Sequence, residues 1–352
     1  MPQFDDPFTT KKPNVTQTTT TTTHAEAIPP LGDIPPAQLA INAAEGRRGA
    51  AWRLMLWIID DDPRAMEAVA SLEDDRLAHH LLEFIALGTW AGKPFVVPPK
   101  LRSSYARIRL SNLFRAEGAM TRERAERVLF AGFRDRRQEV RGIAITILGE
   151  MGDRVAEPLL LQALHDPSHQ VRMQAARALG KLRDPSVVPT LLETLKGADE
   201  QMVNQVFASL VQIGPPAIPA VAHEMHSASP WIRWHCMRAF GEMQDFRAIP
   251  YLIAGLRDLD TGVCWMAAKS LVLYGKASLE PVLRQLESSV PNQLQAETSC
   301  YILHQLYLRD SKLTPYLKPV VEAFSGVANT LAVSSLASKA LVQLRADHLL
   351  SA

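Results

Sequence analysis

The sequence has few cysteines, and its charges are balanced. Three of 352 residues are cysteines, Cys236, Cys264 and Cys300, and they stand 28 and 36 residues apart with no C-x-x-C pair. This set excludes the disulfide framework of small secreted domains, so we interpret the cysteines as small core residues in a reducing compartment. The 38 Lys and Arg against 37 Asp and Glu leave a net charge of +1. No global field therefore attracts nucleic acid or an anionic membrane, and such a partner would need a local patch.

Long apolar runs and secretory features are also missing. The apolar stretch from Leu54 to Ile59 is far too short to span a bilayer. The first residues lack the basic start, apolar stretch and small-residue cleavage site of a secretory signal. We therefore expect a cytoplasmic protein.

Strand signals are absent as well, because no Asn-Gly or Asp-Gly turn joins two β-branched runs. From Pro36 onward, apolar residues recur at spacings of three and four, as in Trp52, Met55, Leu56 and Ile59. These spacings are typical of helical faces and predict an all-α chain. Residues 1–35 have little such periodicity but contain a run of threonines, and four closely spaced prolines stand at positions 29, 30, 35 and 36, so we expect a disordered tail with no assigned role.

The chain repeats itself with a period of about 31 residues. Val140 and Val171, Gly149 and Gly180, and Pro158 and Pro189 are each separated by 31. Each unit predicts two helices joined by a turn, and neither helix can bury its apolar stripe alone. Stacked neighbours can, which predicts a solenoid with a quasi-one-dimensional core.

The unit from Asp166 to Leu195 reads D-P-x-x-x-V-R-x-x-A-A-x-A-L-G-x-L-x-D followed by V-x-P-x-L-L-x-x-L. This pattern resembles HEAT repeats of the phycobilisome (PBS) lyase HEAT-like class. The resemblance implies a right-handed α-solenoid of helix pairs. We expect HEAT-like repeats over 135–290, a helical N-terminal region or cap over 36–134, and a degenerate repeat with C-terminal capping helices over 291–352.

The resemblance also implies that the V-R-x-x-A-A helix lines the concave surface and that its variable positions contact a partner. Three rows of candidate residues follow, together with Trp231 at a helix start: Met173, Trp234 and Trp265; Gln174, His235 and Met266; Arg177, Arg238 and Lys269. Trp and Arg are enriched at binding hot spots, so these rows predict a protein-binding surface. The alternative is that Trp234 and Trp265 pack between units as core.

Arg141, Arg172 and Arg233, which follow the anchor residue of their units, recur with the repeat. We expect them to bond carboxylates or loop carbonyls of a neighbouring unit. Val203 and Cys264 replace this Arg in the third and fifth units and should interrupt the series.

No enzyme motif is complete, and we expect no cofactor, no metal site and no catalytic residue. Two families with similar repeats stay open as alternatives. Deoxyhypusine hydroxylase, an oxidoreductase, holds a di-iron centre with several His-Glu pairs, whereas this chain has only His223-Glu224. Bilin lyases attach or remove a tetrapyrrole, and nothing outside the repeats supports that activity.

A third alternative is nucleic-acid binding through residues 100–141. This segment holds twelve Lys and Arg against five acids, a local excess of +7. The favoured hypothesis is a non-catalytic scaffold that binds a protein along the concave face. Its predicted contact residues are Trp231, Trp234, His235, Arg238, Trp265, Met266, Lys269, Met173 and Arg177.

Overall fold

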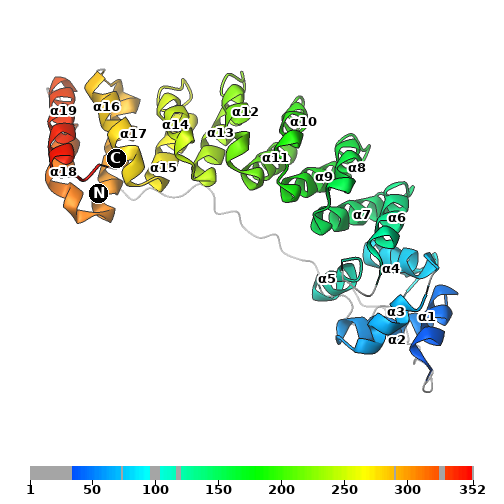
Figure 1. The fold of residues 1–352 in the computed structure, drawn as a ribbon. Coiled ribbons are helices and arrows are strands. Elements are labelled where there is room, and N and C mark those ends of the chain that lie inside the picture. The colour runs from blue at the N-terminus through cyan, green and yellow to red at the C-terminus, as the bar shows by residue number, and fades with distance from the viewer. Residues whose placement is uncertain are drawn as a thin grey trace, which may run out of the picture.

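The computed structural model describes residues 34–72, 74–95, 104–115, 120–288, 291–324 and 330–350. The tail predicted over 1–35 lies almost wholly outside these residues. The described part forms an arc of stacked helices, with α1 (Pro36–Ala44) at one end and α19 (Thr330–Ala346) at the other (Figure 1). The predicted all-α solenoid is confirmed.

The N-terminal end of the arc departs from the regular repeat. After α1, this end consists of α2 (Arg48–Ile59), α3 (Pro63–Ala70), α4 (Arg76–Leu87), β1 (Thr89–Trp90), β2 (Lys93–Pro94), α5 (Ser104–Asn112) and α6 (Arg122–Phe133). Helices α1 to α4 bury Leu39, Leu54, Met55 and Leu81.

The short antiparallel pair of β1 and β2 was not expected from the sequence. Its turn uses Ala91 and Gly92, both at positive φ. Buried Trp90 ties it to α1, because its indole Nε1 donates to the Ala43 carbonyl at 2.9 Å.

From residue 138 the helices alternate between two rows. The first row consists of α7 (Gln138–Met151), α9 (His169–Leu182), α11 (Glu200–Ile213), α13 (Pro230–Met243) and α15 (Thr261–Leu273). The second consists of α8 (Glu157–Ala163), α10 (Val188–Glu193), α12 (Ile218–Glu224), α14 (Ile249–Gly255) and α16 (Lys276–Ser288). The first row lies on the inner, concave side of the arc and α8 to α14 on the outer side (Figure 1). We call the solvent-facing side of the first row the inner face.

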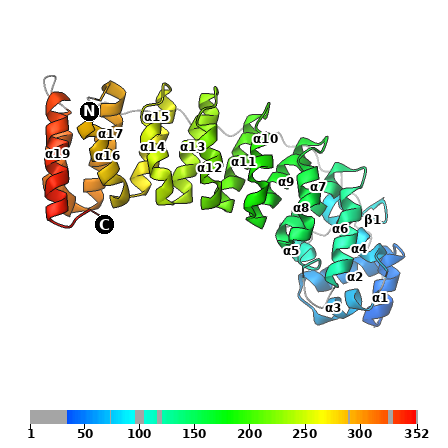
Figure 2. The same ribbon diagram turned by 45° about the horizontal axis from the view of Figure 1, so that its top comes forward.

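The C-terminal end consists of α17 (Gln293–Arg309), α18 (Thr314–Ala323) and α19. Helix α19 packs against α16 and α18. It lies at the far end of the stack in both views (Figures 1 and 2). Leu341 and Leu344 of α19 are buried, so this last helix covers the apolar side of the stack.

The sequence explains how the outer helices begin. Short 3-10 turns precede α8, α10, α14 and, at the C-terminal end, α18: η2 (Arg154–Ala156), η3 (Pro185–Val187), η5 (Phe246–Ala248) and η6 (Ser311–Leu313). An Asp precedes each turn and accepts a hydrogen bond from the backbone N–H two residues later, as Asp184 does from Ser186 at 2.9 Å. In the third unit, Gly214 replaces this Asp before η4 (Pro215–Ala217). These caps satisfy N–H groups that a helix start leaves free.

Close packing between inner helices depends on small residues. A Cβ added to Gly149 of α7 would lie 2.4 Å from the Cβ of Ala178 on α9. Serines take the place of Ala178 one and three units later, and each ties its helix to the preceding inner helix: the Ser209 hydroxyl donates to the Ala176 carbonyl at 2.8 Å and that of Ser270 to the Met237 carbonyl at 2.9 Å.

Among the described residues, none of the individual helices has the length and apolar composition to cross a membrane. Glu200–Ile213 and Pro215–Glu224 meet that test only as a pair, and they are bent by 119°.

Candidate functional site

The predicted contact residues on α13 form an aromatic cluster. The rings of Trp231 and Trp234 stack with centroids 5.4 Å apart and an interplanar angle of 2°. Trp231 is 39% exposed and Trp234 is partly exposed. Because α13 packs against α11, α12, α14 and α15, its open side is the inner face. The two indoles therefore present a flat apolar surface there.

His235 is a correction to the predicted surface, because its side chain is fully buried. Phe207 of α11 stacks on one side of the imidazole at 5.2 Å, and Trp231 and Trp234 meet it edge-on at 4.6 and 4.9 Å. The two indoles thus cover a position that is partly exposed in two other units, at Gln174 and Met266. Neither ring nitrogen of His235 has a hydrogen-bond partner among the described residues. Burial, with the nearby Arg238 charge, lowers the pKa of His235 to about 4, so this side chain supports the tryptophans as a neutral ring.

The predicted basic row lies beside this cluster. The Arg238 guanidinium carbon is 5.6 Å from the centroid of the Trp234 ring, a cation–π arrangement. Its Nε is 3.5 Å from Glu242 Oε1, so its charge is only loosely paired. Arg177 is exposed and donates to the neutral amide of Gln205 at 3.3 Å. Lys269 is exposed and forms no ion pair within the described part of the chain.

Trp265 continues the apolar surface on α15. It is partly exposed, like Met266 and Met173, and contacts Tyr301 of α17 edge to face at 5.5 Å. Lys269 and Leu273 follow Trp265 at i+4 and i+8 and so share its helical face. Leu273 is 52% exposed.

Tyr301 and Leu273 were not predicted as contact residues. Helix α17 is longer than the inner helices before it, so the repeat period did not assign Tyr301 to a contact position. Leu273 could have been found from its spacing to Trp265.

The recurring arginines have the structural role expected of them. Arg141 donates through Nε and Nη2 to both carboxylate oxygens of Asp166 in the next unit, at 2.8 and 2.9 Å. Arg233 makes the same pair with Asp258 at 2.7 and 2.8 Å. Burial raises the pKa of both carboxyl groups, but the hydrogen bonds from arginine and backbone N–H more than offset it, so each pKa lies below its ordinary value.

At the three other positions of this series, the pair is absent, and Val203 has no side chain that could form it. Cys264 replaces the arginine, and its thiol donates to the Asp258 carbonyl at 3.2 Å. Arg172 donates to the loop carbonyls of Asp166 and Pro167 at 2.9 and 3.2 Å and has no carboxylate partner among the described residues.

The cysteines lie in inner helices, as expected for core residues. Cys236 and Cys264 are buried and Cys300 is partly buried, all as free thiols. Burial raises the pKa of each thiol.

Metal-ligating side chains are not grouped in the described ranges, where no set of three His, Cys, Asp or Glu is placed to hold an ion. The single His-Glu pair lies on α12, where His223 is exposed.

The basic segment 100–141 is largely neutralised by acids from outside it. Seven of its arginines form ion pairs, with partners such as Asp61, Asp75, Glu83, Glu150 and Asp153. Arg124 is buried and also donates to the Asp74 carbonyl at 2.6 Å. Among the described residues, these acids offset most of the excess of +7 counted along the linear segment. Lys100 and Arg102 lie outside the described residues.

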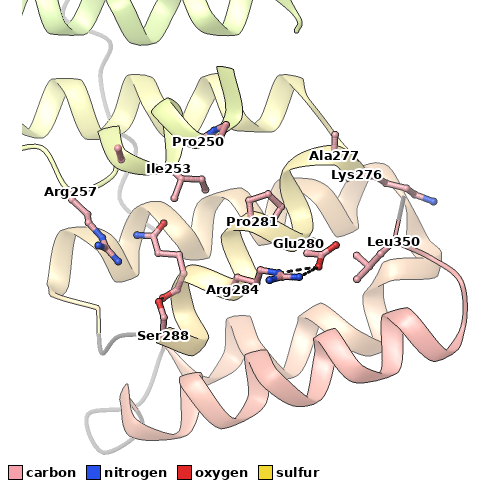
Figure 3. A pocket seen from close by; sticks show the side chains of 12 residues that line it. Pro250, Ile253, Arg257, Lys276, Ala277, Glu280, Pro281, Arg284, Ser288 and Leu350 are labelled. Carbon is pink, nitrogen blue, oxygen red and sulfur yellow. Dashed lines mark hydrogen bonds and ion pairs between the residues drawn. The ribbon is translucent and has the colours of Figure 1, made fainter. Parts of the chain in front are cut away.

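A cavity of about 880 Å³ lies away from the predicted residues, between α14 and α16 (Figure 3). Pro250, Ile253 and Pro281 line it, and Leu350 covers one end. Its charged groups are paired within the chain, since Arg284 Nη2 lies 2.7 Å from Glu280 Oε1.

Comparison with known proteins gives one sequence family. Residues 126–211 match the family model of HEAT repeats. None of the curated proteins matches the sequence at a significant level. The HEAT match covers α7, α9 and most of α11, including the first two of the units recognised by their period.

Several solved structures are similar. A crystal structure of importin beta is 15% identical with a TM-score of 0.47, and the match covers 86% of this chain and 45% of that one. The chain thus spans less than half the length of importin beta. The complex of CpcE and CpcF of phycocyanin lyase from Nostoc is 21% identical with a TM-score of 0.32, covering 71% and 96% of the two chains. Human deoxyhypusine hydroxylase is 19% identical with a TM-score of 0.26, covering 66% and 97%.

Proposed function

We propose that this protein is a non-catalytic scaffold that binds a partner protein along the inner face of its HEAT-repeat solenoid. The observation that carries the proposal is the stacked pair of Trp231 and Trp234, which stays accessible to solvent on α13. The core positions of this helix are already filled by Cys236, Ala239 and Phe240, all fully buried. The indoles are therefore not needed to fill the core, and exposed apolar surface of this kind is typical of binding sites.

The charges beside the tryptophans favour a partner with acidic and apolar side chains. Arg177, Arg238 and Lys269 come from three different inner helices; among the described residues Arg177 and Lys269 form no ion pair, and Arg238 has only the 3.5 Å pair with Glu242. Trp265 and Met266 extend the apolar part onto α15. Rigid stacked helices hold these groups in place before binding, so little conformational entropy is lost in the scaffold. We further propose that the repeats are of the phycobilisome-lyase-like class and that the protein acts in the cytoplasm.

The test is an affinity capture from the source cell's lysate, with nuclease treatment in every arm. The intact protein is compared with the Trp234→Ala/Trp265→Ala variant, and we expect the variant to lose the partner. Phe246→Ala is the matched control, because Phe246 is a 73% exposed aromatic side chain in the turn η5, outside the first row of helices. It should retain the partner.

Helicity must be checked in the same variants. Trp234 covers His235, so we expect a modest loss of stability but an unchanged far-ultraviolet circular dichroism spectrum. Retention of the partner by the folded double variant would contradict the proposal. Recovery of nuclease-sensitive material that does not depend on the tryptophans would move the function to nucleic acid and the segment 100–141.

A further inference from the structure

Arg141 and Arg233 occupy the position of Arg172 in two other units, so their contacts can be compared with those of Arg172. In Arg141 and Arg233, Nη1 donates to a carbonyl of the preceding loop, at 3.0 and 2.9 Å. Nε and Nη2 then face the next loop and hold its Asp. Arg172 makes the same Nη1 bond, at 2.9 Å to the Asp166 carbonyl. Its guanidinium is therefore anchored as in the other two units.

The carboxylate that this arginine would bind is missing from the sequence. The partners of Arg141 and Arg233 stand 25 residues further along, at Asp166 and Asp258, and the corresponding position for Arg172 is Gly197. Gly197 has no Cβ and no atom within 4 Å of where one would lie. Apart from its two chain neighbours, no residue therefore fills the space next to Gly197 that a Cβ would occupy.

The nearest acid of the same loop is engaged elsewhere. Asp199 accepts a hydrogen bond from the Met202 N–H at 2.8 Å and caps α11. Its other carboxylate oxygen lies 2.8 Å from His169 Nε2. Asp199 therefore does not replace the absent group, and Arg172 keeps two donors in a fork that fits a carboxylate.

A cavity of about 340 Å³ lies at this position. Arg172, Gly197, His165, His169 and Lys196 line it, so cationic and imidazole groups surround the fork. The carboxylates of Glu193 and Asp199 also line it, but Glu193 lies 3.7 Å from Lys196 Nζ in an ion pair, and Asp199 bonds the Met202 N–H and His169 as described above.

We infer that this cavity is a carboxylate-binding site, in which Arg172 takes from outside the chain the group that Asp166 and Asp258 supply in the sister units. The bound group forms two parallel N–H···O bonds with Nε and Nη2. It comes either from an Asp or Glu side chain of a bound protein or from a small free carboxylate. Only the first source rests on the scaffold function proposed above.

The test uses small probes and the full chain. Acetate represents a free carboxylate, and acetyl-Gly-Glu-Gly-amide represents an acidic side chain. Acetyl-Gly-Gln-Gly-amide is the neutral control. Binding is followed by saturation-transfer NMR titration at constant ionic strength, adjusted with chloride. We expect both carboxylate probes to bind, and the Gln peptide to bind at least tenfold more weakly than the Glu peptide.

Two variants test the assignment to Arg172. Arg172→Gln removes the fork and should weaken the Glu peptide by about tenfold or more, the scale expected for a charge-assisted bidentate pair. Gly197→Asp supplies the missing carboxylate within the chain and should block the probes to a similar extent. Gly197 has φ +74°, which Asp and Asn tolerate better than other residues with a side chain. Gly197→Asn therefore controls for strain and bulk, and should bind within about threefold of the wild type.

Arg136→Gln controls for net charge, since Arg136 is exposed and does not line the cavity. Wild-type binding by Arg172→Gln, or no binding of either carboxylate probe to the wild type, would overturn the inference. Tighter binding of acetate than of the peptide identifies a free carboxylate as the ligand, and the reverse order identifies an acidic side chain. These probes do not involve the tryptophans, so failure here leaves the capture experiment unaffected.

Discussion

Close approach of the inner helices makes a specific glycine indispensable. Replacing Gly149 by Ala would place its Cβ 2.4 Å from the Cβ and 2.7 Å from the Cα of Ala178. One of these is a backbone atom, so α7 and α9 must separate. Such overpacking costs about 1–3 kcal/mol, whereas Ala in place of Gly gains about 1 kcal/mol of helix propensity. We expect Gly149→Ala to lower the free energy of unfolding by about 1 kcal/mol.

Gly142→Ala is the matched control on the same helix. Its Cβ would meet only the side chain of Gln174, whose Oε1 at 2.1 Å belongs to a flexible group with no hydrogen-bond partner among the described residues. Gln174 can rotate away, so the propensity gain remains and Gly142→Ala should be neutral or stabilising by up to about 1 kcal/mol. The assay is urea unfolding of the full chain, followed by circular dichroism. A Gly149→Ala protein as stable as Gly142→Ala would refute the argument that helix approach limits this position.

Three further predictions concern buried polar groups. The folded-state pKa of His235, about 4, lies below the ordinary value near 6.5. Between these pH values only the unfolded chain takes up the proton. The free energy of unfolding should therefore fall by about 3 kcal/mol as the pH drops across this range. His235→Leu should remove this loss in urea titrations at pH 7 and 4.5, and an equal loss in both proteins would contradict the pKa. Arg233→Gln leaves the largely buried Asp258 carboxylate unpaired and should cost about 2 kcal/mol in the same assay at pH 7. In native protein a thiol reagent should modify only Cys300, slowly, while Cys236 should react only after unfolding; rapid labelling of Cys236 would show that α13 opens.

The regular part of the fold could be predicted because its packing is local. Each unit contacts only its neighbours, so the residues that repeat every 31 positions are the ones that pack between units. Val171, Ala175 and Leu179, which follow one another at spacings of four in the sequence, are all buried. The capping Asp and the following Pro that start the outer helices can also be found in the sequence.

What failed depended on contacts between units. His235 occupies a variable position, and its burial requires Phe207 of the preceding inner helix and the stacking of two tryptophans on its own helix. The ion pairs of residues 100–141 with acids such as Glu83 and Asp153 also form only in the folded chain, and nucleic-acid binding through this segment stays a prediction. Gly197 is different, because the period of 31 residues makes it the equivalent of Asp166 in the next unit. Once the arginine–aspartate pairs are known, the sequence alone therefore shows that Arg172 lacks its carboxylate.

The two proposed contact regions can be reached by one partner. Arg172 and Trp231 both lie in the first turn of their inner helices, α9 and α13, with α11 between them. Neighbouring packed helices are about 8–10 Å apart, which puts these turns about 20 Å apart. An extended segment of about six residues covers that distance at about 3.3 Å per residue. A partner with an acidic residue about six positions from an aromatic or aliphatic residue would therefore engage both regions. For that partner Arg172→Gln and Trp231→Ala would each weaken binding, whereas acetate would respond to Arg172 alone.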